Sequence, residues 1–173
     1  MFKKWLPNML TCVNLSFGVF SILEIIKQNY IASAVFIIIA AFIDRYDGRI
    51  ARLLNVSSEF GKELDSLADL VSFGVAPALL IFNKFNFLDL GNIKVVGSCF
   101  LLLYIISGSC RLANYNISKF DGVFIGVPIT VAGLILALYS LAAPSHIISA
   151  LISLIILMLL AYFMVSKFEF KKI

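Results

Sequence analysis

Four aspartates lie near one another in the sequence, in two pairs whose spacing suits a helix. Asp44 and Asp47 are three residues apart, and Asp65 and Asp69 are four apart, so each pair shares one helix face. Carboxylates without cysteine or histidine beside them select a hard cation such as Mg²⁺, Mn²⁺ or Ca²⁺. Two such ions bridged by shared carboxylates are a known arrangement for phosphoryl chemistry. The aspartates therefore predict a divalent-metal site that acts on a phosphate group.

Small and basic residues accompany the aspartates. Gly48 leaves the helix surface open for a bulky anionic ligand, Ala51 keeps that face shallow, and Arg52 can form paired hydrogen bonds to phosphate oxygens. Gly61 opens the surface in the same way one turn before the second pair. Ser58 can cap the helix that follows or donate to a phosphate. These residue types favour a phosphate-containing ligand.

A solvated loop is the simpler explanation for charges in this stretch, which holds six of the ten acidic residues. It accounts well for Glu59, Lys62 and Glu63. It does not account for Asp44, Asp47 or Asp69, because acids inside apolar runs are costly unless they are paired or bind a cation. We therefore expect a functional role for the aspartates.

Composition indicates what kind of chain positions these residues. The chain has 173 residues, is 61% hydrophobic and has a mean hydropathy of +1.02, values that exclude an ordinary soluble protein. Its length suits one domain spanning residues 1–173. We expect a single-domain integral membrane protein whose function lies in or beside the bilayer.

Six apolar stretches are each close to the ~20 residues that a helix needs to cross a ~30 Å hydrocarbon core. Their ranges are 8–26, 30–48, 64–82, 95–112, 123–142 and 146–166. We predict an all-α fold of six transmembrane helices. The aspartate pairs then lie at the end of the second helix and the start of the third. The segment of about fifteen residues between them, 49–63, lets these helices pack as antiparallel neighbours.

The distribution of lysine and arginine predicts the orientation of the helices. Under a six-helix count, eleven basic residues lie on one side: Lys3, Lys4, Arg45, Arg49, Arg52, Lys62, Arg111, Lys119, Lys167, Lys171 and Lys172. Three lie on the other: Lys27, Lys84 and Lys94. By the positive-inside rule, both termini and the aspartates face the cytoplasm. The net charge of +4 then reflects membrane orientation, and no nucleic-acid partner is expected.

One motif covers all four aspartates. The pattern D-x2-D-G-x2-A-R-x8-G-x3-D-x3-D is matched by Asp44, Asp47, Gly48, Ala51, Arg52, Gly61, Asp65 and Asp69. It resembles the signature of the CDP-alcohol phosphotransferase family. The resemblance implies a membrane enzyme, typically a homodimer, that moves a phosphatidyl or similar group from a CDP-linked donor to an alcohol and releases CMP.

The resemblance also implies roles for individual residues. The four aspartates correspond to the family's metal ligands for Mg²⁺ or Mn²⁺, and Asp69 also to its proposed general base. Gly48, Arg52 and Ser58 correspond to positions that hold the CDP part of the donor, together with Ala51 and Gly61 of the motif. These roles agree with the chemistry of the reaction. An alcohol needs a base to accept its proton, and the pyrophosphate needs cations to offset its negative charge.

Three further segments resemble the phosphatidylserine synthase branch of that family. They are "LDSLADLVSFGVAPALL" at 64–80, "GSCRLANYN" at 108–116 and "FIGVPITVAG" at 124–133. The branch implies CDP-diacylglycerol as donor and L-serine as acceptor. It more often has Arg-Leu-Ala-Arg-Phe-Asn in the second segment, so Asn114 replaces a possible second cation.

Residues for the acceptor are expected beyond the motif. Arg111, at the cytoplasmic end of the predicted fourth helix, can pair with the carboxylate of free serine, although a basic flank of the helix would also explain it. Asn114 and Asn116 can orient either the substrate or the loop. Other acceptors remain open: glycerol 3-phosphate, which calls for several cations, inositol phosphate, or an amino alcohol. A cation carrier is the alternative from another class, but it would place its acids near mid-bilayer.

A polar stripe runs along the first predicted helix. Asn8, Thr11 and Asn14 are spaced by three residues within an otherwise apolar span. Such stripes often join helices through hydrogen bonds. Alternatively, Asn8 and Thr11 contact the CDP part of the donor.

Overall fold

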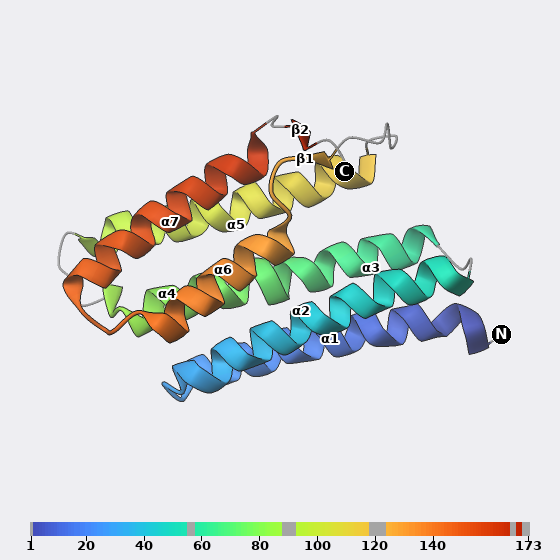
Figure 1. The fold of residues 1–173 in the computed structure, drawn as a ribbon, viewed down its shortest axis with the longest axis horizontal. Coiled ribbons are helices and arrows are strands. Elements are labelled where there is room, and N and C mark those ends of the chain that lie inside the picture. The colour runs from blue at the N-terminus through green and yellow to red at the C-terminus, as the bar shows by residue number, and fades with distance from the viewer. Residues whose placement is uncertain (1, 55–57, 88–92, 118–123, 167–168, 171–173) are drawn as a thin grey trace.

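A computed structural model of the chain describes residues 2–54, 58–87, 93–117, 124–166 and 169–170. Within these ranges the side chains of residues 2–6, 47, 50–54, 93–94, 124–125 and 169–170 are left undescribed. Helices make up nearly all of the described chain, which confirms the all-α prediction (Figure 1).

The helices follow the predicted apolar stretches. They are α1 (Phe2–Ile26), α2 (Tyr30–Leu54), α3 (Glu59–Asp69), the π-helical segment η1 (Leu70–Val75), α4 (Ala76–Lys84), α5 (Ile93–Ile117), α6 (Ile129–Ala142) and α7 (Ile147–Val165). Two short strands, β1 (Phe124–Ile125) and β2 (Glu169–Phe170), pair antiparallel. The segments α3, η1 and α4 follow one another without a break and correspond to one predicted helix.

Several predicted helix boundaries were wrong. The first four predicted helices all extend beyond their apolar runs into polar or charged sequence, because backbone hydrogen bonding continues a helix past the end of a hydrophobic run. The fifth begins at Ile129 rather than at residue 123. Pro128 lies directly before it, and Gly126 has a φ of +73°, a left-handed conformation that interrupts a helix.

Four helical stretches in the described chain are long and apolar enough to cross a membrane: Pro7–Ile26, Glu59–Lys84, Val95–Ile117 and Ile147–Val165. The apolar helix α6 is shorter. Large hydrophobic side chains are exposed along these helices, among them Phe20, Leu102 and Ile155, as expected for surfaces that face lipid. The chain is therefore a membrane protein, and six spans remain a prediction.

The helices are arranged in two groups with α6 between them. Figure 1 shows α1 and α2 side by side and antiparallel, and α5 alongside α7. The helix α6 contacts α2, η1 and α4. The start of α1, the end of α2, the start of α3 and the end of α5 all lie toward the right of the view. Residues from four helices can therefore meet at this end.

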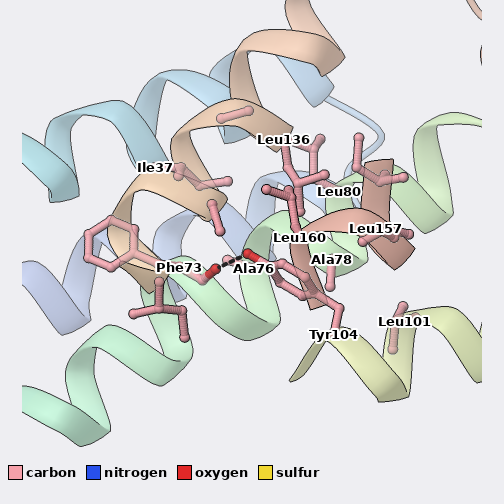
Figure 2. Close-up of a cluster of buried hydrophobic side chains, with 14 of the residues drawn as sticks. Ile37, Phe73, Ala76, Ala78, Leu80, Leu101, Tyr104, Leu136, Leu157 and Leu160 are labelled. Carbon is pink, nitrogen blue, oxygen red and sulfur yellow. Dashed lines mark hydrogen bonds between the residues drawn. The ribbon is translucent and has the colours of Figure 1, made fainter. Parts of the chain in front are cut away.

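The hydrophobic core surrounds the π-helical segment. Phe73, at the centre of η1, is fully buried, and a side chain at Gly133 of α6 would come within 2.9 Å of the Phe73 backbone. A π-helix widens the turn, so its backbone groups need new partners. The hydroxyl of buried Tyr104 donates to the Phe73 carbonyl at 2.8 Å (Figure 2). The core thus fixes the segment that directly follows Asp69.

Replacing Tyr104 by phenylalanine is expected to destabilise this segment. The carbonyl of Phe73 would lose its side-chain donor in the core, which costs about 1–2 kcal/mol for a buried group. Thermal unfolding in detergent should show a lower midpoint for Tyr104→Phe. Tyr162→Phe is the matched control, because Tyr162 is exposed on α7, and an equal loss in both variants would contradict the explanation.

Candidate active site

Three of the four aspartates converge between α2 and α3. Asp44 comes from α2 and Asp65 and Asp69 from α3, and one carboxylate oxygen of each lies within 4.8 Å of the other two. Asp69 is only 8% exposed, and the other two are half-buried. Asp47 belongs to α2, but its side chain lies outside the described part.

The local sequence explains how α2 and α3 place these acids. The helix α2 continues past its apolar run to Leu54, so Asp44 remains inside a regular helix. The helix α3 begins at Glu59 after Ser58, whose hydroxyl oxygen accepts a hydrogen bond from the Gly61 N–H at 3.0 Å. This N-cap fixes the first turn. Asp65 and Asp69 then follow on one face.

Two residues from other helices bind these carboxylates through neutral side chains. The Asn14 amide of α1 donates from Nδ2 to Oδ1 of Asp69 at 3.2 Å. The Thr130 hydroxyl of α6 donates to Oδ2 of Asp44 at 3.4 Å. The sequence had indicated Asn14 only as one residue of a polar stripe on the first helix. Thr130 had no predicted role and lay within the segment 124–133 that resembles the family. Neither contact was predicted.

The electrostatics of the cluster favour a bound cation. Neither Asp44 nor Asp65 forms an ion pair with any lysine or arginine whose side chain is described, and Oδ1 of Asp65 is buried without a hydrogen-bond partner there. Two carboxylates at such a separation repel by about 3 kcal/mol at an effective dielectric constant of 20. A hard divalent ion removes this repulsion and uses the donor set that is present. The residues therefore fit a metal.

The predicted donor-binding residues whose side chains are described lie in different environments. Asn8 lies against the first turn of α3, because a side chain at Gly61 would come within 3.0 Å of its Oδ1. Thr11 is buried and its hydroxyl donates to the Pro7 carbonyl of the same helix at 3.1 Å. Gly48 is half-buried on α2.

Two other predicted donor-binding residues, Ala51 and Arg52, belong to α2. Their side chains lie outside the described part of the chain. Their predicted contacts with the donor therefore stay predictions.

The predicted acceptor-binding residues separate into different environments. Arg111 of α5 is half-buried, lies close enough to Asp69 for their charges to attract, and has a buried Nε with no partner in the described chain. Asn116 donates to Ser66 Oγ at 3.0 Å and to Glu63 Oε1 at 3.2 Å, so it joins α5 to α3. Asn114 is exposed. Arg111 therefore has a buried donor that is available to a ligand.

Comparison with known proteins agrees with this geometry. A family model described as CDP-alcohol phosphatidyltransferase matches residues 4–166. The chain is 36% identical over 168 residues to the CDP-diacylglycerol–serine O-phosphatidyltransferase of Bacillus subtilis strain 168, covering 96% of this chain and 90% of the relative.

Two relatives with the same printed name are longer than this chain. The one from Helicobacter pylori strain J99 is 36% identical over 135 residues, covering 76% of this chain and 55% of the relative. The one from Methanocaldococcus jannaschii is 34% identical over 136 residues, covering 79% of this chain and 62% of the relative. The matches confirm the family predicted from the motif. The chain belongs to the CDP-alcohol phosphatidyltransferase family.

Proposed function

We propose that this chain transfers the phosphatidyl group of CDP-diacylglycerol to the hydroxyl of L-serine, giving phosphatidylserine and CMP. The observation that carries the proposal is the convergence of Asp44, Asp65 and Asp69 in a chain whose relatives bear the name of this activity. Three acids close together, of which Asp44 and Asp65 form no ion pair with a described cation, suit a metal-assisted reaction at a pyrophosphate.

The carboxylates would hold Mg²⁺ or Mn²⁺, in two ions if Asp47 joins the cluster, and the metal would supply positive charge to the pyrophosphate. Asp69 accepts the proton of the serine hydroxyl. The hydroxyl oxygen then forms a bond to the phosphorus that carries diacylglycerol. The bond from that phosphorus to the bridging oxygen breaks, and CMP leaves with the electron pair.

The remaining predicted residues position the substrates. Along α2 and the start of α3, the CDP part would lie against Gly48, Ala51, Arg52, Ser58 and Gly61. Asn8 and Thr11 of α1 would border the same space, and the closeness of Asn8 to Gly61 in the first turn of α3 supports this for Asn8. Asn116 acts indirectly, through Ser66 beside Asp65.

The wider architecture in this proposal is one domain over residues 1–173, with six spans and both termini in the cytoplasm. The clustered basic residues and the shared end of α2, α3 and α5 in Figure 1 support a cytoplasmic site in the cell membrane. We also propose a homodimer, as the family resemblance implies.

A panel of acceptors tests the proposed function. Purified protein with CDP-diacylglycerol and Mn²⁺ should release CMP with L-serine well above the rate with water. Glycerol 3-phosphate, inositol phosphate and ethanolamine should give no more CMP than water. If one of these replaced serine, the acceptor assignment would fail within the same family. Cation flux into liposomes without CMP release would instead indicate a carrier.

Arg111 is expected to bind the carboxylate of serine. Arg111→Gln should raise the KM for serine about 10- to 100-fold, because a charge-assisted hydrogen bond contributes about 1.5–3 kcal/mol. The KM for CDP-diacylglycerol should change little. Lys62→Gln, which removes an exposed cation on α3, is the control. An unchanged KM for serine in Arg111→Gln would show that this arginine does not bind serine and serves only as a basic residue flanking the helix.

A further inference from the structure

Asn14 is a buried amide within an apolar helix. It is fully buried, on a face of α1 that packs against α3 and η1. Its Nδ2 donates to Asp69, but its Oδ1 is buried with no partner in the described chain. A buried acceptor without a partner destabilises a fold. Packing alone therefore does not explain an asparagine here.

The contact with Asp69 suits a carboxylate that must stay charged. A carboxylate only accepts hydrogen bonds, so a donor is needed to fix its plane. A lysine or arginine donor would form an ion pair and weaken the carboxylate as a base, whereas an acidic residue would repel it. The neutral amide donor at 3.2 Å restricts the rotation of the side chain and adds no positive charge of its own beside the carboxylate.

The backbone of the same residue secures the helix on the other side of Asp69. The buried Ser72 hydroxyl, in η1, donates to the Asn14 carbonyl at 3.1 Å. Asp69 is the last residue of α3, so α1 is bound to the chain just before and just after η1 begins. The two contacts have different roles. The hydrogen bond from Ser72 to the Asn14 backbone joins α1 to η1, whereas the hydrogen bond from the Asn14 side chain binds the Asp69 carboxylate.

We propose that Asn14 is a positioning residue for Asp69, whose amide holds this carboxylate in the orientation that accepts the proton of the acceptor alcohol. This inference rests on the proposed role of Asp69 as the base. Asn14 does not touch the substrate in this proposal. It acts through Asp69, and its loss should lower turnover without weakening substrate binding.

The test compares three variants. Asn14→Leu has a similar size and no donor, and Asn14→Asp keeps the shape but replaces the donor by an acceptor. Both should lower kcat about 100-fold with the KM values within about threefold. Ser72→Ala, which removes only the backbone contact, is the matched control and should lower the thermal midpoint while keeping kcat within about threefold. Binding of CDP in the presence of Mn²⁺, measured by calorimetry, should be unchanged in both Asn14 variants.

Defined outcomes would overturn the inference. They are near-normal kcat in either folded Asn14 variant, loss of CDP binding along with kcat, or an equal loss of kcat in Ser72→Ala. If Asn14→Leu does not fold, Asn14→Asp decides alone. Failure of the proposed function looks different, because the wild-type protein would then release no CMP with serine. The variants are compared with whichever alcohol the wild type uses.

Discussion

Replacing Asp69 by asparagine is expected to lower kcat for CMP release by about 10³-fold, within the range that a general base contributes. The amide has nearly the same shape but cannot accept the proton of the serine hydroxyl. The initial rate of CMP release at saturating serine and Mn²⁺ measures the effect. The thermal midpoint should stay near that of the wild type, because the substitution removes a charge from a site that is already crowded with carboxylates.

A matched control separates the role of Asp69 from a general effect of charge on α3. Glu59 is exposed in the first turn of the same helix, so Glu59→Gln removes one negative charge away from the cluster. We expect its kcat to match that of the wild type. Near-normal turnover in Asp69→Asn would remove Asp69 as the base, and the acid cluster would then serve only to bind metal.

Removing divalent cations is expected to abolish CMP release completely. EDTA would leave the three carboxylates without the positive charge that offsets both their mutual repulsion and the charge of the pyrophosphate. Adding Mn²⁺ or Mg²⁺ in excess of EDTA should restore the rate. A rate that persists after EDTA treatment and dialysis against metal-free buffer would contradict a metal-dependent mechanism.

The same metal should stabilise the folded protein. A ligand at 100 times its Kd adds about 2.7 kcal/mol to the free energy of unfolding, so Mn²⁺ should raise the thermal midpoint. Asp65→Asn should lose most of this gain, and its metal-free form should be at least as stable as the wild type because one like charge is gone. Glu59→Gln should keep the full gain.

The sequence predicted the acid cluster because its causes are local. Helical periodicity puts Asp65 and Asp69 on one face, and the short chain between α2 and α3 brings Asp44 to them. The same reasoning missed the partners of the cluster. Asn14 and Thr130 reach it from helices 55 and 86 residues away in the chain, and the packing of the whole bundle decides which polar side chain meets which acid.

The π-helical segment η1 was also beyond prediction from the sequence. Its residues, Leu70–Val75, are as apolar as an ordinary membrane helix. The wider turn depends on partners elsewhere, namely the Tyr104 hydroxyl and the close approach permitted by Gly133. The late start of α6 had a local cause, Pro128, which the hydrophobic pattern alone did not reveal.

The positions of the cluster residues and their partners along the chain also determine the order in which they are synthesised. A chain is made from its N-terminus, so Asp44, Asp65 and Asp69 are all present before α4 is complete. Asn14 already exists at that stage, whereas Thr130 is synthesised only after α5. A nascent chain that ends before α6 would therefore already carry the three clustered aspartates and the amide of α1, whereas the Thr130 hydrogen bond to Asp44 would form only later.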